Sequence, residues 1–219
     1  MEELNACPLF SGLEGRDFMY AADFFSCREK KYDKGSVIAT TGVMLESFGY
    51  VVSGGVQVSM EDIDGRRLIM ANVTPGDTFA ESLYFLERES PVYITAIAES
   101  RIVWMKCDRI KNGSSFGTRL DGILTNRFIA LLAGRTLSMN DRIQILSKPS
   151  IREKLVTFFS QYMVKLGTNS FSVPFDRTSM AEYLGVDRSS LSRELSKMRN
   201  EGIIEFRKDK FTIITGINT

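Results

Sequence analysis

The sequence predicts an α+β protein with an N-terminal β-roll of the jelly-roll type, a long dimerisation helix and a C-terminal winged helix-turn-helix. Three observations predict this order. Short runs rich in Val, Ile, Tyr and Phe are separated by turn residues between positions 30 and 109, which is typical of a barrel or jelly roll. A helical stripe of apolar residues then spans 114–146. A helix-turn-helix pattern follows over 176–199.

The N-terminal region combines short helices with strands. Residues 1 to about 28 predict helical pieces whose apolar contacts are Leu9, Phe10, Leu13, Phe18, Phe24 and Phe25. Beyond Lys30, glycine-containing turns separate strand-like runs, and the dipeptide Asp64-Gly65 is a strong hairpin signal between two of them. The alternation over 56–58 and 94–97 predicts half-buried strands.

The segment 114–146 predicts one long helix. Its apolar stripe consists of Phe116, Leu120, Leu124, Phe128, Leu131, Leu132, Met139, Ile143 and Leu146. Such a helix would be about 45 to 50 Å long, which exceeds what a small barrel needs for cover. We therefore expect pairing with a second copy, the alternative being burial against its own domain. The run Ser147-Lys148-Pro149-Ser150 breaks the helix and is expected to form a hinge.

The segment 176–199 has the sequence pattern of two helices joined by a tight turn. Gly185 can adopt the left-handed conformation that ends the first helix, and Asp187 is a good N-cap for the second. Leu191, Leu195 and Met198 lie at i, i+4 and i+7, which predicts one buried face. The other face consists of Arg188, Ser189, Ser192, Arg193 and Lys197. Because Arg can donate two hydrogen bonds to guanine, this pattern predicts a helix that lies in the DNA major groove, the alternative being a solvated basic face.

The flanking segments complete a winged domain. Residues 151–166 predict an amphipathic helix that ends at Gly167. Two strands, 203–206 and 211–214, flank the basic tip Arg207-Lys208-Asp209-Lys210. A hairpin of this kind can contact phosphate, so we expect it to act as a wing.

Composition and charge restrict the function further. The net charge is +1, but residues 148–219 contain 12 Lys and Arg against 8 Asp and Glu, whereas residues 1–147 contain 16 against 19. This asymmetry fits one DNA-binding domain beside a domain with another role. The chain contains no histidine, which excludes histidine-based metal sites and general bases, so we do not expect an enzyme. The acidic N-terminus and the lack of a long apolar run predict a cytoplasmic protein without a membrane partner.

Three segments resemble the cyclic-AMP receptor protein / FNR (CRP/FNR) family of bacterial transcription regulators: FGYVVSGGVQV at 48–58, PGDTFAES at 75–82, and the helix pair at 177–199. The resemblance implies an effector-sensing, cyclic-nucleotide-binding-like β-roll over 1–112, a dimerisation helix over 113–147 and a winged helix-turn-helix over 148–219. It also implies a homodimer that binds a palindromic operator in double-stranded DNA, with RNA polymerase as a protein partner. It identifies no cofactor.

The effector cassette departs from that of the family members that bind cyclic AMP. Their acidic residue accepts from the ribose, and their arginine pairs with the cyclic phosphate. Glu81 matches the acid, but Ala80 replaces the preceding glycine, and Ser90 stands where the arginine is expected. Without that cation the phosphate would be buried unpaired, although Arg88 is close enough to substitute if the cassette is remodelled. We therefore expect an unidentified effector other than cyclic AMP at a site formed by Glu81, Ser82, Ser90 and Pro91.

The resemblance also assigns DNA contacts by position. Arg188, Ser192 and Arg193 correspond to groove residues, and Ser189 replaces a glutamate, so the operator sequence cannot be transferred. The expected phosphate contacts are Arg177, Thr178, Ser190 and Arg207, with Lys197 and Lys208 as further basic residues of the interface. Two alternatives remain. One is a thiol redox switch at Cys7, Cys27 or Cys107, although these do not reproduce the iron–sulfur cluster motif of the oxygen-sensing branch; the other is a small-molecule sensor whose helix-turn-helix contacts proteins.

Overall fold

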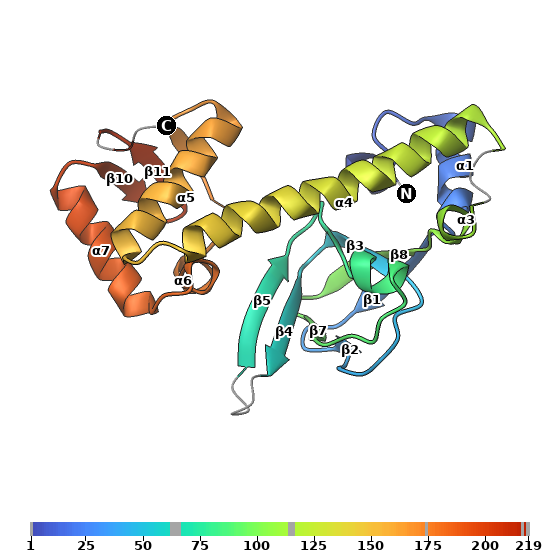
Figure 1. Cartoon of the computed structure of the whole chain (residues 1–219), viewed down its shortest axis with the longest axis horizontal. Coiled ribbons are helices and arrows are strands. Elements are labelled where there is room, and N and C mark those ends of the chain that lie inside the picture. Colours follow the sequence, from blue (N-terminus) through green and yellow to red (C-terminus); the bar gives the residue numbers. More distant parts are fainter. Residues whose placement is uncertain (1, 62–66, 114–116, 174, 216, 218–219) are drawn as a thin grey trace. The chain divides into compact units, whose positions relative to one another are not determined.

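The computed structural model describes residues 2–61, 67–113, 117–173, 175–215 and 217. It divides into two compact units, Met1–Gly134 and Arg135–Thr219 (Figure 1). The division falls inside the long helix α4 (Arg119–Leu146), so the last three turns of that helix belong to the second unit. Within these residues, no helix is long and apolar enough to cross a membrane.

The first unit contains the predicted β-roll, built from antiparallel strands in two sheets. The strands are β1 (Arg28–Tyr32), β2 (Val37–Ala39), β3 (Phe48–Ser53), β4 (Val56–Glu61), β5 (Arg67–Val73), β6 (Thr78–Phe79), β7 (Tyr93–Ala96) and β8 (Ser100–Met105). One sheet has the order β1-β8-β3-β6 and the other β2-β7-β4-β5. The hairpin predicted at Asp64-Gly65 lies outside the described residues, but β4 and β5 on either side of it are paired antiparallel.

Period-two alternation places the first sheet between two cores. In β3, Phe48 and Tyr50 face one core while Val51 faces the other. The core between the sheets includes Val51 and Ile102. The opposite core is covered by helices: the 3₁₀-helix η1 (Glu2–Ala6), α1 (Gly15–Phe24), α2 (Glu81–Phe85), α3 (Asp108–Lys111) and the beginning of α4. The short N-terminal helices are therefore confirmed, and their role is to cover the sheet.

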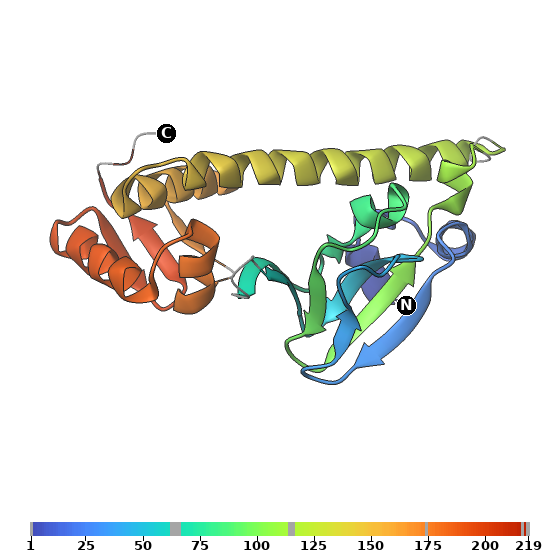
Figure 2. The same ribbon diagram turned by 60° about the horizontal axis from the view of Figure 1, so that its bottom comes forward.

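Helix α4 begins at Arg119, five residues later than the periodicity predicts. Thr118 and Asp121 explain this start, because each accepts a hydrogen bond from the other's backbone amide, at 3.2 and 2.8 Å. Residues 114–116, with the predicted contact Phe116, lie outside the described part of the chain. The 28 residues of α4 correspond to a length of about 42 Å, and Figures 1 and 2 both show α4 as one continuous helix.

The apolar side chains of α4 have two different environments. Leu124 and Phe128 are buried in the core of the first unit, and Ile145 is buried in the core of the second. A further set along the helix is exposed to solvent: Ile123, Ile129, Leu137, Met139, Ile143 and Leu146. The helix therefore buries only part of its apolar surface within one chain.

The second unit is a winged helix-turn-helix. Its elements are α5 (Ile151–Leu166), β9 (Ser170–Ser172), α6 (Arg177–Leu184), α7 (Arg188–Asn200), β10 (Ile204–Arg207) and β11 (Lys210–Ile213). Ser150 and Glu153 form a reciprocal capping box at the start of α5, and Gly167 ends the helix in the left-handed conformation. The sheet order β10-β11-β9 adds one strand, β9, that the sequence analysis did not predict. The predicted fold class is confirmed in both units.

Candidate nucleic-acid interface

The turn between α6 and α7 has the predicted geometry. Gly185 has φ +62°, and a Cβ at this position would lie 3.0 Å from Cδ2 of Leu146. Glycine is therefore required both by the backbone conformation and by the close approach of α4. Lys154 of α5 strengthens the turn, because its Nζ donates to the carbonyl oxygen of Leu184 at 3.0 Å. Both neighbouring helices are thus fixed at their junction.

Side-chain caps define the start of each helix. The carboxylate of Asp176 accepts from the amide of Ser179 at 2.7 Å, and that of Asp187 accepts from the amide of Ser190 at 2.9 Å. These bonds lower the pKa of both carboxyls, that of Asp187 to about 2 with the hydroxyl of Ser189 as the largest cause. Ionised caps at helix N-termini also stabilise the helix dipole.

The two faces of α7 differ as predicted. Leu191, Leu195 and Met198 are fully buried and pack against Ala181 of α6. The opposite face consists of exposed polar and basic side chains: Arg188, Ser189, Ser192, Arg193 and Lys197. Because the buried stripe fixes the rotation of the helix, the basic face is held toward solvent.

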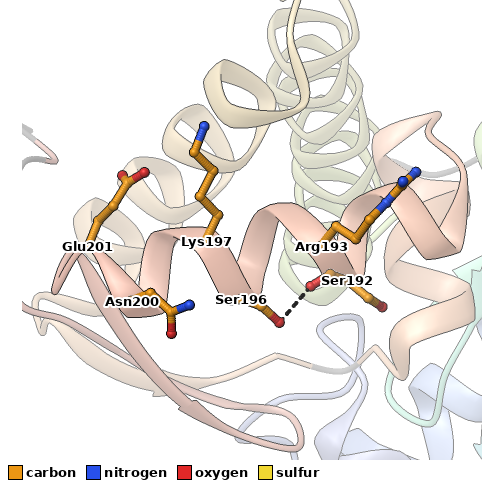
Figure 3. A pocket seen from close by; sticks show the side chains of 6 residues that line it. All are labelled: Ser192, Arg193, Ser196, Lys197, Asn200 and Glu201. Carbon is orange, nitrogen blue, oxygen red and sulfur yellow. Dashed lines mark hydrogen bonds between the residues drawn. The ribbon is translucent and has the colours of Figure 1, made fainter.

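Figure 3 shows two rows of side chains along this exposed face. One row contains Ser192, Ser196 and Asn200, and the adjacent row contains Arg193, Lys197 and Glu201; both line one shallow hollow. The i, i+4 spacing from Ser192 leads directly to Ser196 and Asn200, which the sequence analysis did not select. These two residues continue the row that begins at Ser192 for about two turns, and Asn200 extends the exposed polar face of α7 by less than one turn beyond Lys197.

Two serines of the predicted interface hold other groups in place. Arg193 donates from Nη2 to Oγ of Ser190 at 3.0 Å. Ser189 donates to Asp187 at 2.6 Å. Ser190 is only partly exposed, and its hydroxyl orients Arg193 in this structure. Its predicted contact with phosphate stays a prediction.

The wing places its basic residues at a two-residue tip. Arg207 pairs with Lys210 across the hairpin, and Lys208 occupies the tip with φ +56°. Arg207, Lys208 and Thr178 are exposed, and their predicted contacts with DNA stay predictions. Arg177 is different: it is half-buried, with its guanidinium carbon 4.9 Å from the ring centre of Phe206.

The predicted effector residues do not form an open site. Glu81 and Ser90 are buried. Thr78 donates its hydroxyl to the Glu81 carboxylate, and Ser90 donates to the carbonyl oxygen of Val92 at 2.9 Å. Ser82 and Pro91 are exposed on the surface. The structure thus places the four residues in different surroundings, and their role in effector binding stays a prediction.

The cysteines lie within the first unit. Cys7 and Cys107 are buried, and Cys27 is partly exposed. Burial raises the pKa of Cys7 to about 11 and that of Cys27 and Cys107 to about 12. Thiols with such pKa values are protonated at neutral pH and react slowly with oxidants.

A sensor-type β-roll joined to a helix-turn-helix with an exposed basic reading face defines a transcription regulator that binds DNA. Two known domain families match the chain in the same order as these two parts. Residues 29–112 match the cyclic nucleotide-binding domain, and residues 153–215 match the Crp-like helix-turn-helix domain. The chain belongs to the CRP/FNR family of transcription regulators.

Relatives of the whole chain are distant. The cAMP-activated global transcriptional regulator Vfr of Pseudomonas aeruginosa is 20% identical over 87% of this chain and 90% of its own length. The structure of FixK2 from Bradyrhizobium japonicum has a TM-score of 0.63 and 24% identity, over 86% of this chain and 93% of its own. A CooA variant from Carboxydothermus hydrogenoformans has a TM-score of 0.70 and 18% identity, over 94% and 91%. At these identities the solved structures support the fold.

Proposed function

We propose that this regulator is a homodimer that reads a palindromic operator in double-stranded DNA and responds to a small effector other than cyclic AMP. The observation with the most weight is the reading face of α7, whose rotation is fixed by three fully buried side chains while Arg188 and Arg193 remain exposed. A rigid helix with exposed arginines can present forked donors to guanine in the major groove.

Dimerisation is supported by the exposed apolar side chains of α4. Ile129, Met139 and Ile143 are each more than half exposed. Ile129 and Ile143 are two heptads apart, and Met139 lies in the alternate core position between them, which is the spacing of a helix pair. A two-fold axis would provide two reading helices for a symmetric operator.

An effector other than cyclic AMP is supported by the chemistry around position 90. Ser90 supplies no positive charge, and its hydroxyl already bonds to Val92 within the chain. A buried cyclic phosphate would lack its cation there. Effector binding would act by shifting the population between arrangements of the reading helices in the dimer. RNA polymerase is the expected protein partner, and the cytoplasm the expected compartment.

Selection from random duplexes tests this proposal, followed by binding measurements on the selected operator. Arg193→Ala should weaken binding to the selected site by about 1–3 kcal/mol and change binding to random DNA little. Lys208→Ala should weaken binding to every sequence and flatten the salt dependence by up to about one unit of slope. Failure to enrich a two-fold symmetric site would refute the palindromic operator. Equal losses on selected and random DNA would show that Arg193 contacts only the backbone.

The two alternatives make different predictions. A thiol redox switch requires reactive thiolates, which the raised pKa values of the cysteines disfavour. Replacement of Cys7, Cys27 and Cys107 by serine should therefore leave regulation unchanged. A helix-turn-helix that contacts only proteins would show no salt-sensitive binding to genomic fragments, whereas our proposal requires it.

A further inference from the structure

Three arginines of the second unit differ in the kind of group that holds them. Arg152 is held by carboxylates: its guanidinium bonds to Glu194 at 2.6 Å and to Glu201 at 2.7 and 3.0 Å. Arg177 and Arg199 are held by aromatic rings. Across the described residues, neither of them lies within 4.0 Å of a carboxylate. No ion pair with another described residue therefore neutralises their charges.

Phe206 of the wing lies against both of these arginines. The guanidinium carbon of Arg177, the first residue of α6, is 4.9 Å from its ring centre, and that of Arg199, near the end of α7, is 5.0 Å from it. The two guanidinium groups are consequently within about 10 Å of each other. Arg177 also lies 5.1 Å from the ring centre of Phe211, the cross-strand partner of Phe206. One aromatic pair thus organises cations from both helices of the helix-turn-helix.

A ring contact leaves the hydrogen-bond donors of an arginine available. A guanidinium over an aromatic ring interacts through its face, whereas its N–H groups radiate in its own plane. Arg177 uses one of them for a weak contact with the sulfur of Met180, at 3.8 Å. Arg199 is exposed, and the described residues show no hydrogen-bond partner for its side chain. Two guanidinium groups that are held in place and keep N–H donors available can donate paired hydrogen bonds to phosphate oxygens.

The surroundings favour the DNA backbone as the source of that phosphate. Arg207, Lys208 and Lys210 add positive charge at the tip of the same hairpin. Burial lowers the pKa of Arg177, whereas Asp209 favours its charged form, and Asp176 and Asp209 line the same hollow as Arg177. The wing, α6 and α7 therefore place more basic than acidic side chains around Phe206.

We propose that Phe206 positions Arg177 and Arg199 as a paired phosphate-binding site for the DNA backbone, with Arg199 as a DNA contact and Phe206 as a positioning residue. The inference rests on DNA binding by this domain. It adds a contact from the C-terminal end of α7 to those expected from the N-terminal end. It also gives a role to the aromatic residue of the wing that contacts both arginines.

Binding of the full-length chain to a labelled random-sequence duplex, measured by anisotropy over a series of salt concentrations, tests the site. Each phosphate contact adds about 0.9 to the slope of log K against log salt. Arg199→Ala should reduce the slope by about 0.9, and the double replacement of Arg177 and Arg199 by alanine by about 1.8. Arg199→Lys should keep the slope, because the charge remains. Lys34→Ala, in a turn of the first unit, is the matched control and should leave the slope unchanged.

The role of the ring is tested separately. Phe206→Leu should weaken duplex binding several-fold while thermal unfolding stays that of a folded protein, and Phe206→Tyr should restore wild-type affinity. An unchanged slope for Arg199→Ala, beside a salt-dependent wild type, would overturn the site and leave the proposed function standing. Wild-type affinity for Phe206→Leu would overturn the positioning role. Absence of salt-dependent binding in the wild type would instead overturn DNA binding itself.

Discussion

Nε of Arg152 in α5 lies 2.6 Å from Oε1 of Glu194 in α7, so an ion pair fixes the reading helix to the helix that precedes the helix-turn-helix. The side chain of Glu194 is only 20% exposed, and Glu201, about two turns later, binds the same guanidinium. This arrangement complements the buried stripe of α7. The stripe fixes the rotation of the helix about its axis, and the ion pair fixes its position along α5.

A double-mutant cycle with Arg152→Met and Glu194→Gln should show a coupling free energy of about 0.5–1 kcal/mol, the range for partly exposed pairs. Methionine keeps the apolar stem of the arginine while it removes the charge. Hydrogen exchange of the α7 amides is the suitable measurement, since it reports on this unit alone. The more exposed pair of Arg109 and Asp23 in the first unit is the control: its own cycle, followed by hydrogen exchange of the α1 and α3 amides, should show a smaller coupling. A coupling no larger than that of the control would mean that the ion pair does not hold α7.

Replacement of Met139 by glutamate should convert the proposed dimer to a monomer. The side chain is 65% exposed in the single chain, and a charge there would be buried without a partner in a paired helix. Sedimentation equilibrium measures the change directly. Asn140→Glu places the same charge on the adjacent exposed position and should leave the dimer intact. If both variants sediment like the wild type, α4 is not the dimer interface.

Ala80→Gly should stabilise the first unit by about 1 kcal/mol. Ala80 has φ +67° and ψ +11°, a left-handed conformation that costs an L-residue roughly 1–2 kcal/mol, part of which the flexibility of glycine in the unfolded chain offsets. Urea unfolding followed by fluorescence of Trp104, the single tryptophan, reports on this unit. Ala22→Gly in the ordinary helix α1 is the control and should destabilise by about 1 kcal/mol. A loss of stability in both variants would show that the conformation at position 80 is not strained.

The cap of α7 should titrate far below the usual range of aspartate. Hydrogen bonds from Ser189 and Ser190 lower the pKa of Asp187 to about 2 from its ordinary value of 3.8. Because the pKa is depressed in the folded chain, the cap contributes its stability above pH 3.8 and loses it as the pH falls through about 2. The amide shifts of Ser189 and Ser190 should therefore have their midpoint near pH 2. Asp187→Asn removes this titration, and a wild-type midpoint near pH 4 would contradict the capping geometry.

The helix-turn-helix could be predicted residue by residue because its determinants are local. Gly185 meets a requirement for positive φ, Asp187 caps the following turn, and the i, i+4, i+7 stripe specifies one buried face. The limits of α5 were predicted for the same reason, since Ser150 and Gly167 act within one turn of the helix. Strand β9 was not predicted, because three residues in a strand give no readable alternation and pair only with a distant partner, β11.

The candidate DNA interface was predicted only in part, because some of its contacts join segments that are distant in the sequence. Amphipathic spacing identified Arg188 and Arg193, whose exposure depends on helix geometry alone. The ring contacts of Arg177 and Arg199 join residues of α6, α7 and β10, and no sequence period relates them. The role of the predicted effector residues stays a prediction, and their contiguous cassette gave no information on which hydroxyls would form hydrogen bonds within the chain.

The sequence alone determined the order of the main elements, the turns that end α5 and α6, the cap of α7 and the buried face of α7, because these follow from interactions within a few residues. Three contacts were decided only by the tertiary structure. Ser90 donates to a backbone carbonyl, Arg152 forms an ion pair with the reading helix, and Phe206 contacts two arginines. Those arrangements depend on which distant segments meet when the cores close. Packing of whole elements, rather than local preference, sets the partners of each long polar side chain.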